Sequence, residues 1–158
     1  MPTIVVTGSR TWRDRGVTCV GMGERAEGAE FSAIESACER ALAALLAERG
    51  WLASETWLFH GGASGADTDA SAAARRLGMH VCLVPARWQS EGRAAGPLRN
   101  ERMLDVARPD AVLAFRAPGE SRGTDHAIAA ARRLQLANTH LTLVRVIQVA
   151  LKRKHDET

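Results

Sequence analysis

The sequence predicts an α/β fold, a Rossmann-like three-layer sandwich in which a mainly parallel sheet of about five strands is flanked by helices. Two observations lead to this prediction. Short apolar runs alternate with segments of helical periodicity along the whole chain. The apolar runs are also nearly continuous, which indicates strands that are buried on both faces by right-handed crossover helices.

Strands are expected at the short apolar runs, several of which are β-branched. They are Thr3 to Thr7, Trp57 to Phe59, Met79 to Val84, Ala111 to Phe115 and Leu141 to Val146. Helices are expected in the intervening segments rich in Ala, Leu, Arg and Glu. These are Phe31 to Glu48, Asp67 to Leu77, Pro97 to Val106 and Thr124 to Leu136.

The length of 158 residues suits one domain, expected over residues 1–150. Residues 12–30 contain four glycines and mixed charges, and are expected to form a mobile loop. Residues 151–158 form a charged C-terminal tail, more typical of a solvated end than of a nucleic-acid patch.

The composition is that of an ordinary globular chain, with 46% apolar and 25% charged residues. Lys and Arg exceed Asp and Glu by only 21 to 18, and they are scattered, so nucleic acid is not a favoured partner. Cys19, Cys38 and Cys82 are far apart and lack metal-ligand spacing, which indicates reduced thiols. No secretory leader or membrane-spanning run is recognised, so we expect a cytoplasmic protein without a membrane partner.

Glycine, hydroxyl and Arg residues follow the predicted strands. Gly8-Ser9-Arg10 follows the first strand, and Trp88 lies shortly after the third. Ligands of an open parallel sheet bind beyond the carboxyl ends of its strands, so these residues should meet at one edge. Such residues suit an anion, because they offer backbone N–H groups and Arg donors.

The segment His60-Gly-Gly-Ala-Ser-Gly-Ala-Asp67, after the second strand, has two interpretations. Gly61, Gly62 and Gly65 could let backbone N–H groups cradle a phosphate at the start of the next helix. Alternatively, the glycines form a tight turn, and Ser64 or Asp67 caps that helix. The segment matches neither the dinucleotide fingerprint nor the P-loop.

A second group lies between Gly92 and Met103, where a flexible loop is expected to run into a helix with Pro97 at its first position. Arg93 could close over a ligand, and Arg99 lies on one helical face with Met103. The alternative for Arg99 is a solvated helix face. For Gly123-Thr124, at the start of the next helix, the alternative is a simple cap.

Catalytic and metal sites receive little support. His60, Ser64 and Asp67 lie too close in one turn for a hydrolase triad. The five histidines are scattered without paired spacing, so we expect no metal or cofactor. Trp88 could stack on a base, although a Trp is more often a packing residue.

The ordered set of motifs resembles the YspA-like, cpYpsA-related branch of the SLOG superfamily. The motifs are Thr7 to Arg10, His60 to Asp67, Pro85 to Trp88, Gly96 to Asn100 and Gly123-Thr124. Related members include the LOG cytokinin-activating phosphoribohydrolases and the DNA-processing protein DprA. The resemblance implies a Rossmann-like sheet, frequent homodimerisation and a pocket for nucleotides or nucleotide-derived ligands such as relatives of ADP-ribose.

LOG enzymes cleave the N-glycosidic bond of nucleoside monophosphates with an Arg and a Glu beside a glycine-rich phosphate loop. Arg99 and Met103 are similar to their Arg-containing helix. Their second motif ends in a catalytic Glu, whereas Ala127 stands at that position here. Hydrolysis would therefore need Asp125, Asp67 or Glu101 as its carboxylate.

Three functions follow from the residues and the resemblance. The first is binding of a nucleotide-like phosphate ligand by a sensor or processing protein. The second is a phosphoribohydrolase with Arg99 and Asp125 as catalytic residues, and the third is a DprA-like DNA-binding module. The predicted ligand-binding residues are Gly8, Ser9, Arg10, Gly61, Gly62, Ser64, Gly65, Asp67, Trp88, Arg93, Gly96, Arg99, Asn100, Gly123 and Thr124.

Overall fold

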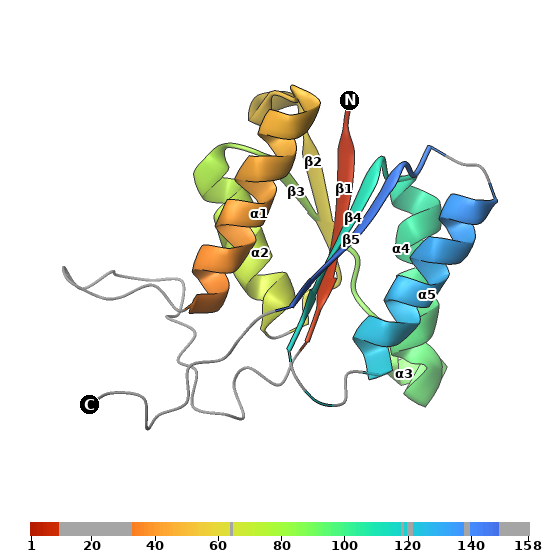
Figure 1. Cartoon of the computed structure of the whole chain (residues 1–158). Coiled ribbons are helices and arrows are strands. Elements are labelled where there is room, and N and C mark those ends of the chain that lie inside the picture. The colour runs from red at the N-terminus through yellow and green to blue at the C-terminus, as the bar shows by residue number, and fades with distance from the viewer. Residues whose placement is uncertain (10–32, 64, 118, 120–121, 138–139, 149–158) are drawn as a thin grey trace, which may run out of the picture.

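The computed structural model contains a five-stranded parallel sheet between two layers of helices, in the strand order β3-β2-β1-β4-β5 (Figure 1). The structure describes residues 1–9, 33–63, 65–117, 119, 122–137 and 140–148, with side chains from residue 37 onward in the second range. The strands are β1 (Thr3–Gly8), β2 (Trp57–His60), β3 (His80–Leu83), β4 (Ala111–Arg116) and β5 (Leu143–Gln148). The helices are α1 (Ala33–Arg49), α2 (Ala66–Leu77), α3 (Trp88–Glu91), α4 (Ala95–Ala107) and α5 (Arg122–Leu136), with 3-10 turns η1 (Ala53–Glu55) and η2 (Gly92–Ala94).

Helices cover both faces of the sheet. Helices α1 and α2 lie on one face, whereas α4 and α5 lie on the other with the short α3 beside them (Figure 1). The central strand β1 divides its side chains between the two layers: Ile4 and Val6 join the core under α1 and α2, and Val5 joins the core with Met103 of α4. Burial on both faces explains why β1 is apolar at successive positions.

The predicted fold class is confirmed, and each predicted strand and helix is present with ends shifted by a few residues. Four strands extend into polar or glycine residues because backbone pairing continues there. Gly8 pairs with Phe115, and Arg116 pairs with Gln148. Pro97 is the third residue of α4 rather than the first, which is tolerated because the N–H groups of the first turn have no intrahelical partner.

The segment that precedes Pro97 was expected to be a flexible loop, and this expectation is wrong. From Gly92 onward it forms η2 and the first residues of α4, and α3 lies directly before it. The guanidinium of Arg102 in α4 donates from Nη2 to both carboxylate oxygens of Glu91, each at 2.9 Å. This two-oxygen ion pair fastens the short helix to the longer one.

The expected loop at residues 12–30 and the tail at residues 151–158 lie outside the described residues. None of the described helices has the length and apolar character needed to cross a bilayer.

Candidate functional site

A cavity of about 410 Å³ lies at the carboxyl end of the sheet, where the strand order reverses between β1 and β4. This is the position at which open α/β sheets bind their ligands. The end of β1 and the first turns of α4 and α5 contribute to its wall. The lining residues are Thr7, Gly8, Ala63, Asp67, Trp88, Arg93, Gly96, Pro97, Arg99, Asn100, Arg122, Gly123 and Thr124.

Many of the residues singled out from the sequence come together in this cavity. They are Gly8, Asp67, Trp88, Arg93, Gly96, Arg99, Asn100, Gly123 and Thr124. The wall also contains four residues that were not among the predicted site residues, namely Thr7, Ala63, Pro97 and Arg122. Each of the four is adjacent in the sequence to a predicted site residue. Its place in a glycine-rich segment or just after a strand was therefore the signal that could have identified it.

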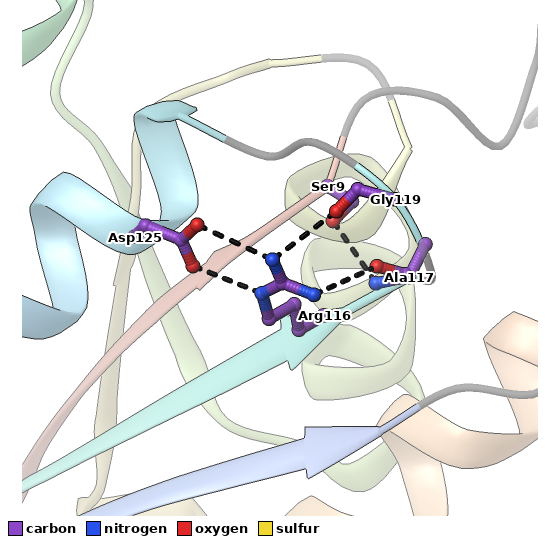
Figure 2. Close-up of polar contacts among 5 residues, drawn as sticks. All are labelled: Ser9, Arg116, Ala117, Gly119 and Asp125. Carbon is purple, nitrogen blue, oxygen red and sulfur yellow. Dashed lines mark hydrogen bonds and ion pairs between the residues drawn. The ribbon is translucent and has the colours of Figure 1, made fainter.

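Other predicted residues do not line the cavity, and these are Ser9, Gly61, Gly62, Gly65 and Asp125. The hydroxyl of the buried Ser9 accepts the N–H of Ala117 at 3.0 Å, which joins the end of β1 to the end of β4. The carboxylate of Asp125 pairs with Arg116 at 2.9 Å (Figure 2). Arg10 and Ser64 lie outside the described residues.

The glycine loop between β2 and α2 uses its own N–H groups. Asp67 Oδ2 accepts the N–H of Gly61 at 3.0 Å and that of Ala63 at 3.3 Å, and His60 Nδ1 accepts the N–H of Gly62 at 3.0 Å. The Asp67 carboxylate therefore occupies donors that an anion would need. This corrects the expectation that Gly61 and Gly62 direct their N–H groups at a phosphate.

The alternative expectation for this loop, a helix capped by a side chain, is also not what the structure shows for Asp67. The N-cap of α2 is Gly65, with a φ of +84° and no hydrogen bond from a capping side chain. Asp67 lies inside the first turn and turns its carboxylate back to the loop. The side chains of Asp67 and His60 stabilise the loop by accepting its N–H groups, but Asp67 does not cap the helix.

Arg99 explains why position 61 is a glycine. Its side chain is only 5% exposed, and its guanidinium donates from Nη1 to the Gly61 carbonyl and from Nε to Asn100 Oδ1 at 3.0 Å. A Cβ on Gly61 would overlap that guanidinium. Asn100 Nδ2 in turn donates to the carbonyl of Gly123 at 3.4 Å. Buried polar groups thus connect the glycine loop, α4 and the first turn of α5.

His60 is neutral in this environment. Burial lowers the pKa of its imidazole to about 4, and the positive charges of Arg75 and Arg99 act in the same direction. The neutral ring has an unprotonated nitrogen, which agrees with Nδ1 accepting the Gly62 N–H. His60 therefore stabilises the loop as a hydrogen-bond acceptor rather than as a cation.

The cavity wall carries charges of both signs. Arg93 and Arg122 contribute positive charge, and Asp67 contributes the carboxylate. Trp88 is 52% exposed and lies over Gly96, where a Cβ would be 3.6 Å from its Cη2. Within the described ranges, no three His, Cys, Asp or Glu side chains come together as metal ligands.

Comparison with known proteins identifies the family of this chain and agrees with its fold. Residues 2–90, more than half of the chain, match the model of the YspA, cpYpsA-related SLOG family. The gene 61 protein of Mycobacterium phage D29 is 30% identical over 138 residues, which cover 84% of this chain and 90% of the phage protein. The X-ray structure of TM1055, a Northeast Structural Genomics Consortium target, has a TM-score of 0.53 at 20% identity over 85% of this chain and 70% of that one, which shows a shared fold. The family match and the α/β architecture together establish that the chain belongs to the YspA, cpYpsA-related SLOG family.

Proposed function

We propose that the protein binds a nucleotide or nucleotide-derived ligand in this cavity, with the phosphate at the start of α5. The observation that carries the proposal is that Arg93, Arg122 and the first turn of α5 share one cavity with an exposed Trp. Family membership supports a nucleotide-related ligand at a coarser level.

The start of α5 offers the donors that the glycine loop does not. The first N–H groups of a helix have no intrahelical partner and lie at the positive end of its dipole. Gly123 and Thr124 lie in this turn and line the cavity, and Arg122 and Arg93 add positive charge. These features fit a phosphate better than the glycine loop does, because Asp67 already occupies the donors there.

The negative charge of Asp67 suits an uncharged part of the ligand rather than its phosphate. A carboxylate repels phosphate but accepts hydrogen bonds from hydroxyl groups, so Asp67 would contact a ribose. Trp88 offers a flat aromatic surface for a base. The cavity thus has acceptors for a sugar, an aromatic surface for a base and cations for a phosphate.

The binding test measures the thermal midpoint of the protein with millimolar AMP, ADP, ADP-ribose, ribose 5-phosphate and inorganic phosphate. We expect at least one organic phosphate to raise the midpoint. Arg122→Gln should weaken its binding by about 10- to 150-fold, since a hydrogen bond to a charged group contributes roughly 1.5–3 kcal/mol. Arg132→Gln is the matched control, because Arg132 is an exposed Arg of the same helix outside this cavity. No shift with any of the five compounds would overturn the proposal.

A phosphoribohydrolase remains the second candidate, because Asp67 and Arg99 line the same cavity. Neither Asp125 nor Glu101 lines it, and the position of the LOG Glu is held by the buried Ala127. Asp67 is therefore the carboxylate that hydrolysis would use. Release of adenine from AMP, lost in Asp67→Asn while AMP still binds, would support this activity, and an absence of base release from all common nucleoside monophosphates would refute it. The homodimer and the DNA-binding role stay predictions from the resemblance.

A further inference from the structure

Arg116, the last residue of β4, contacts several points of the chain that leads into α5 (Figure 2). Its Nε donates to Asp125 Oδ1 at 2.9 Å, and its Nη2 donates to Asp125 Oδ2 at 3.3 Å. The same Nη2 donates to the carbonyl of Gly119 at 3.1 Å, and Nη1 donates to that of Ala117 at 3.5 Å. One guanidinium thus joins the end of β4 to the first turn of α5.

Ser9 adds a second attachment to the same connection. Its hydroxyl accepts the N–H of Ala117 at 3.0 Å, and its own N–H donates to the carbonyl of Phe115 at 3.0 Å. Figure 2 shows Ser9 and Arg116 converging on Ala117. Because Ser9 is buried at the end of β1, it fixes where the chain leaves the sheet.

The residues assigned to the phosphate lie between these attachments and Asp125. Arg122, Gly123 and Thr124 line the cavity and directly precede Asp125, whose side chain does not line it. A rotation of the first turn of α5 would therefore move Asp125 away from Arg116 and the three cavity residues away from the ligand together. The position of the ion pair is therefore linked to the position of the cavity wall, because Asp125 directly follows the three cavity residues in the chain.

We propose that Arg116 is a positioning residue for ligand binding, and that its pairing with Asp125 holds the first turn of α5 in the orientation that receives the phosphate. This proposal rests on the proposed function, since it assigns the phosphate to Arg122 through Thr124. Arg116 acts from outside the cavity and does not touch the ligand.

The ion pair suits positioning better than stabilisation. The side chains of Arg116 and Asp125 are 26% and 51% exposed, and ion pairs so exposed contribute little to the free energy of unfolding. Orienting the binding residues before the ligand arrives improves affinity, because the ligand then does not have to order them. The hydrogen bonds from Arg116 lower the pKa of the Asp125 carboxyl, so the pair remains charged at neutral pH.

The test compares Arg116→Gln, Asp125→Asn and the double variant with the wild-type protein. Arg145→Gln is the matched control, because it breaks the Arg145–Glu48 pair, which has Nη2 at 2.8 Å and Nη1 at 3.3 Å from the carboxylate and side-chain exposures of 35% and 49%. Calorimetry measures the Kd for AMP and ADP-ribose. We expect Arg116→Gln and Asp125→Asn each to raise the Kd about tenfold, the double variant to be no worse than either, and the thermal midpoint to change no more than in Arg145→Gln.

An unchanged Kd in Arg116→Gln, or an equal rise in Arg145→Gln, would overturn the positioning role. Effects of the two single changes that add up fully in the double variant would overturn it too, because the residues would then act separately. If the wild-type protein binds neither probe nor any of the other three compounds, the proposed function fails, and hydrogen exchange of the ligand-free protein decides the structural part. The amides of residues 126–128 report on the first turn, because the carbonyls of residues 122–124 accept their hydrogen bonds in α5. We expect these amides to exchange faster in Arg116→Gln than in Arg145→Gln, and equal exchange would refute the proposal.

Discussion

Acid should destabilise the protein through His60, because the folded state resists protonation of this ring. Burial lowers the pKa of His60 from 6.5 to about 4. Between these two values the unfolded chain binds a proton that the folded chain does not, so stability falls as the pH falls. The contribution is fully present above pH 6.5 and is lost as the pH approaches the folded value of about 4.

The size of the effect follows from the shift in pKa. Each unit corresponds to roughly 1.4 kcal/mol, and most of the shift is traversed between pH 7.5 and 4.5, so this ring accounts for roughly 2–3 kcal/mol of lost stability. Protonation also removes Nδ1 as the acceptor of the Gly62 N–H, which loosens the glycine loop.

Urea unfolding at pH 7.5 and pH 4.5 measures this loss. In His60→Asn the amide oxygen lies near the position of Nδ1 and does not titrate, so the variant should lose roughly 2–3 kcal/mol less than the wild-type protein over the same interval. The control His140→Asn removes an exposed His and should behave as the wild type does. If His60→Asn loses as much stability as the wild type, His60 is not held neutral and its assigned role is incorrect.

Further predictions concern the end of β1. Gly8→Ala should destabilise the fold by about 2–3 kcal/mol in urea unfolding, because its Cβ would overlap that of Ala66 and lie 2.7 Å from the carbonyl oxygen of Phe115; unchanged stability would contradict this packing. Ser9→Ala should cost about 1–3 kcal/mol, since the buried N–H of Ala117 loses its acceptor, and full retention of stability would show that water replaces the hydroxyl.

The nearly continuous apolar runs made the fold predictable from the sequence. The ends of the strands were less predictable, because they depend on pairing with neighbouring strands that are distant in the sequence. The polar ending of β4 at Arg116 is set by its register with β5, which no local pattern contains. The helix α3 was missed because four residues are too few to show helical periodicity.

The sequence predicted where the candidate site lies, but not the hydrogen-bond and ion-pair partners of its side chains. Sheet topology places the post-strand residues at one edge, which the sequence could anticipate. The orientation of the Asp67 side chain could not be read from the sequence. In the structure Asp67 lines the cavity, and its Oδ2 also accepts the Gly61 and Ala63 N–H groups of the loop. Asp125 was likewise a candidate catalytic residue in the sequence, but in the structure its carboxylate forms an ion pair with Arg116.

The cavity wall divides at the boundary of the family match. All three arginines in the wall, Arg93, Arg99 and Arg122, lie beyond residue 90, whereas Asp67 and Trp88 lie within the matched residues 2–90. The half that defines the family therefore supplies the acceptor and the aromatic surface, and the other half supplies the cations. Under the proposed function, substitutions after residue 90 would change the cations that meet the phosphate and leave the residues of the family match unchanged.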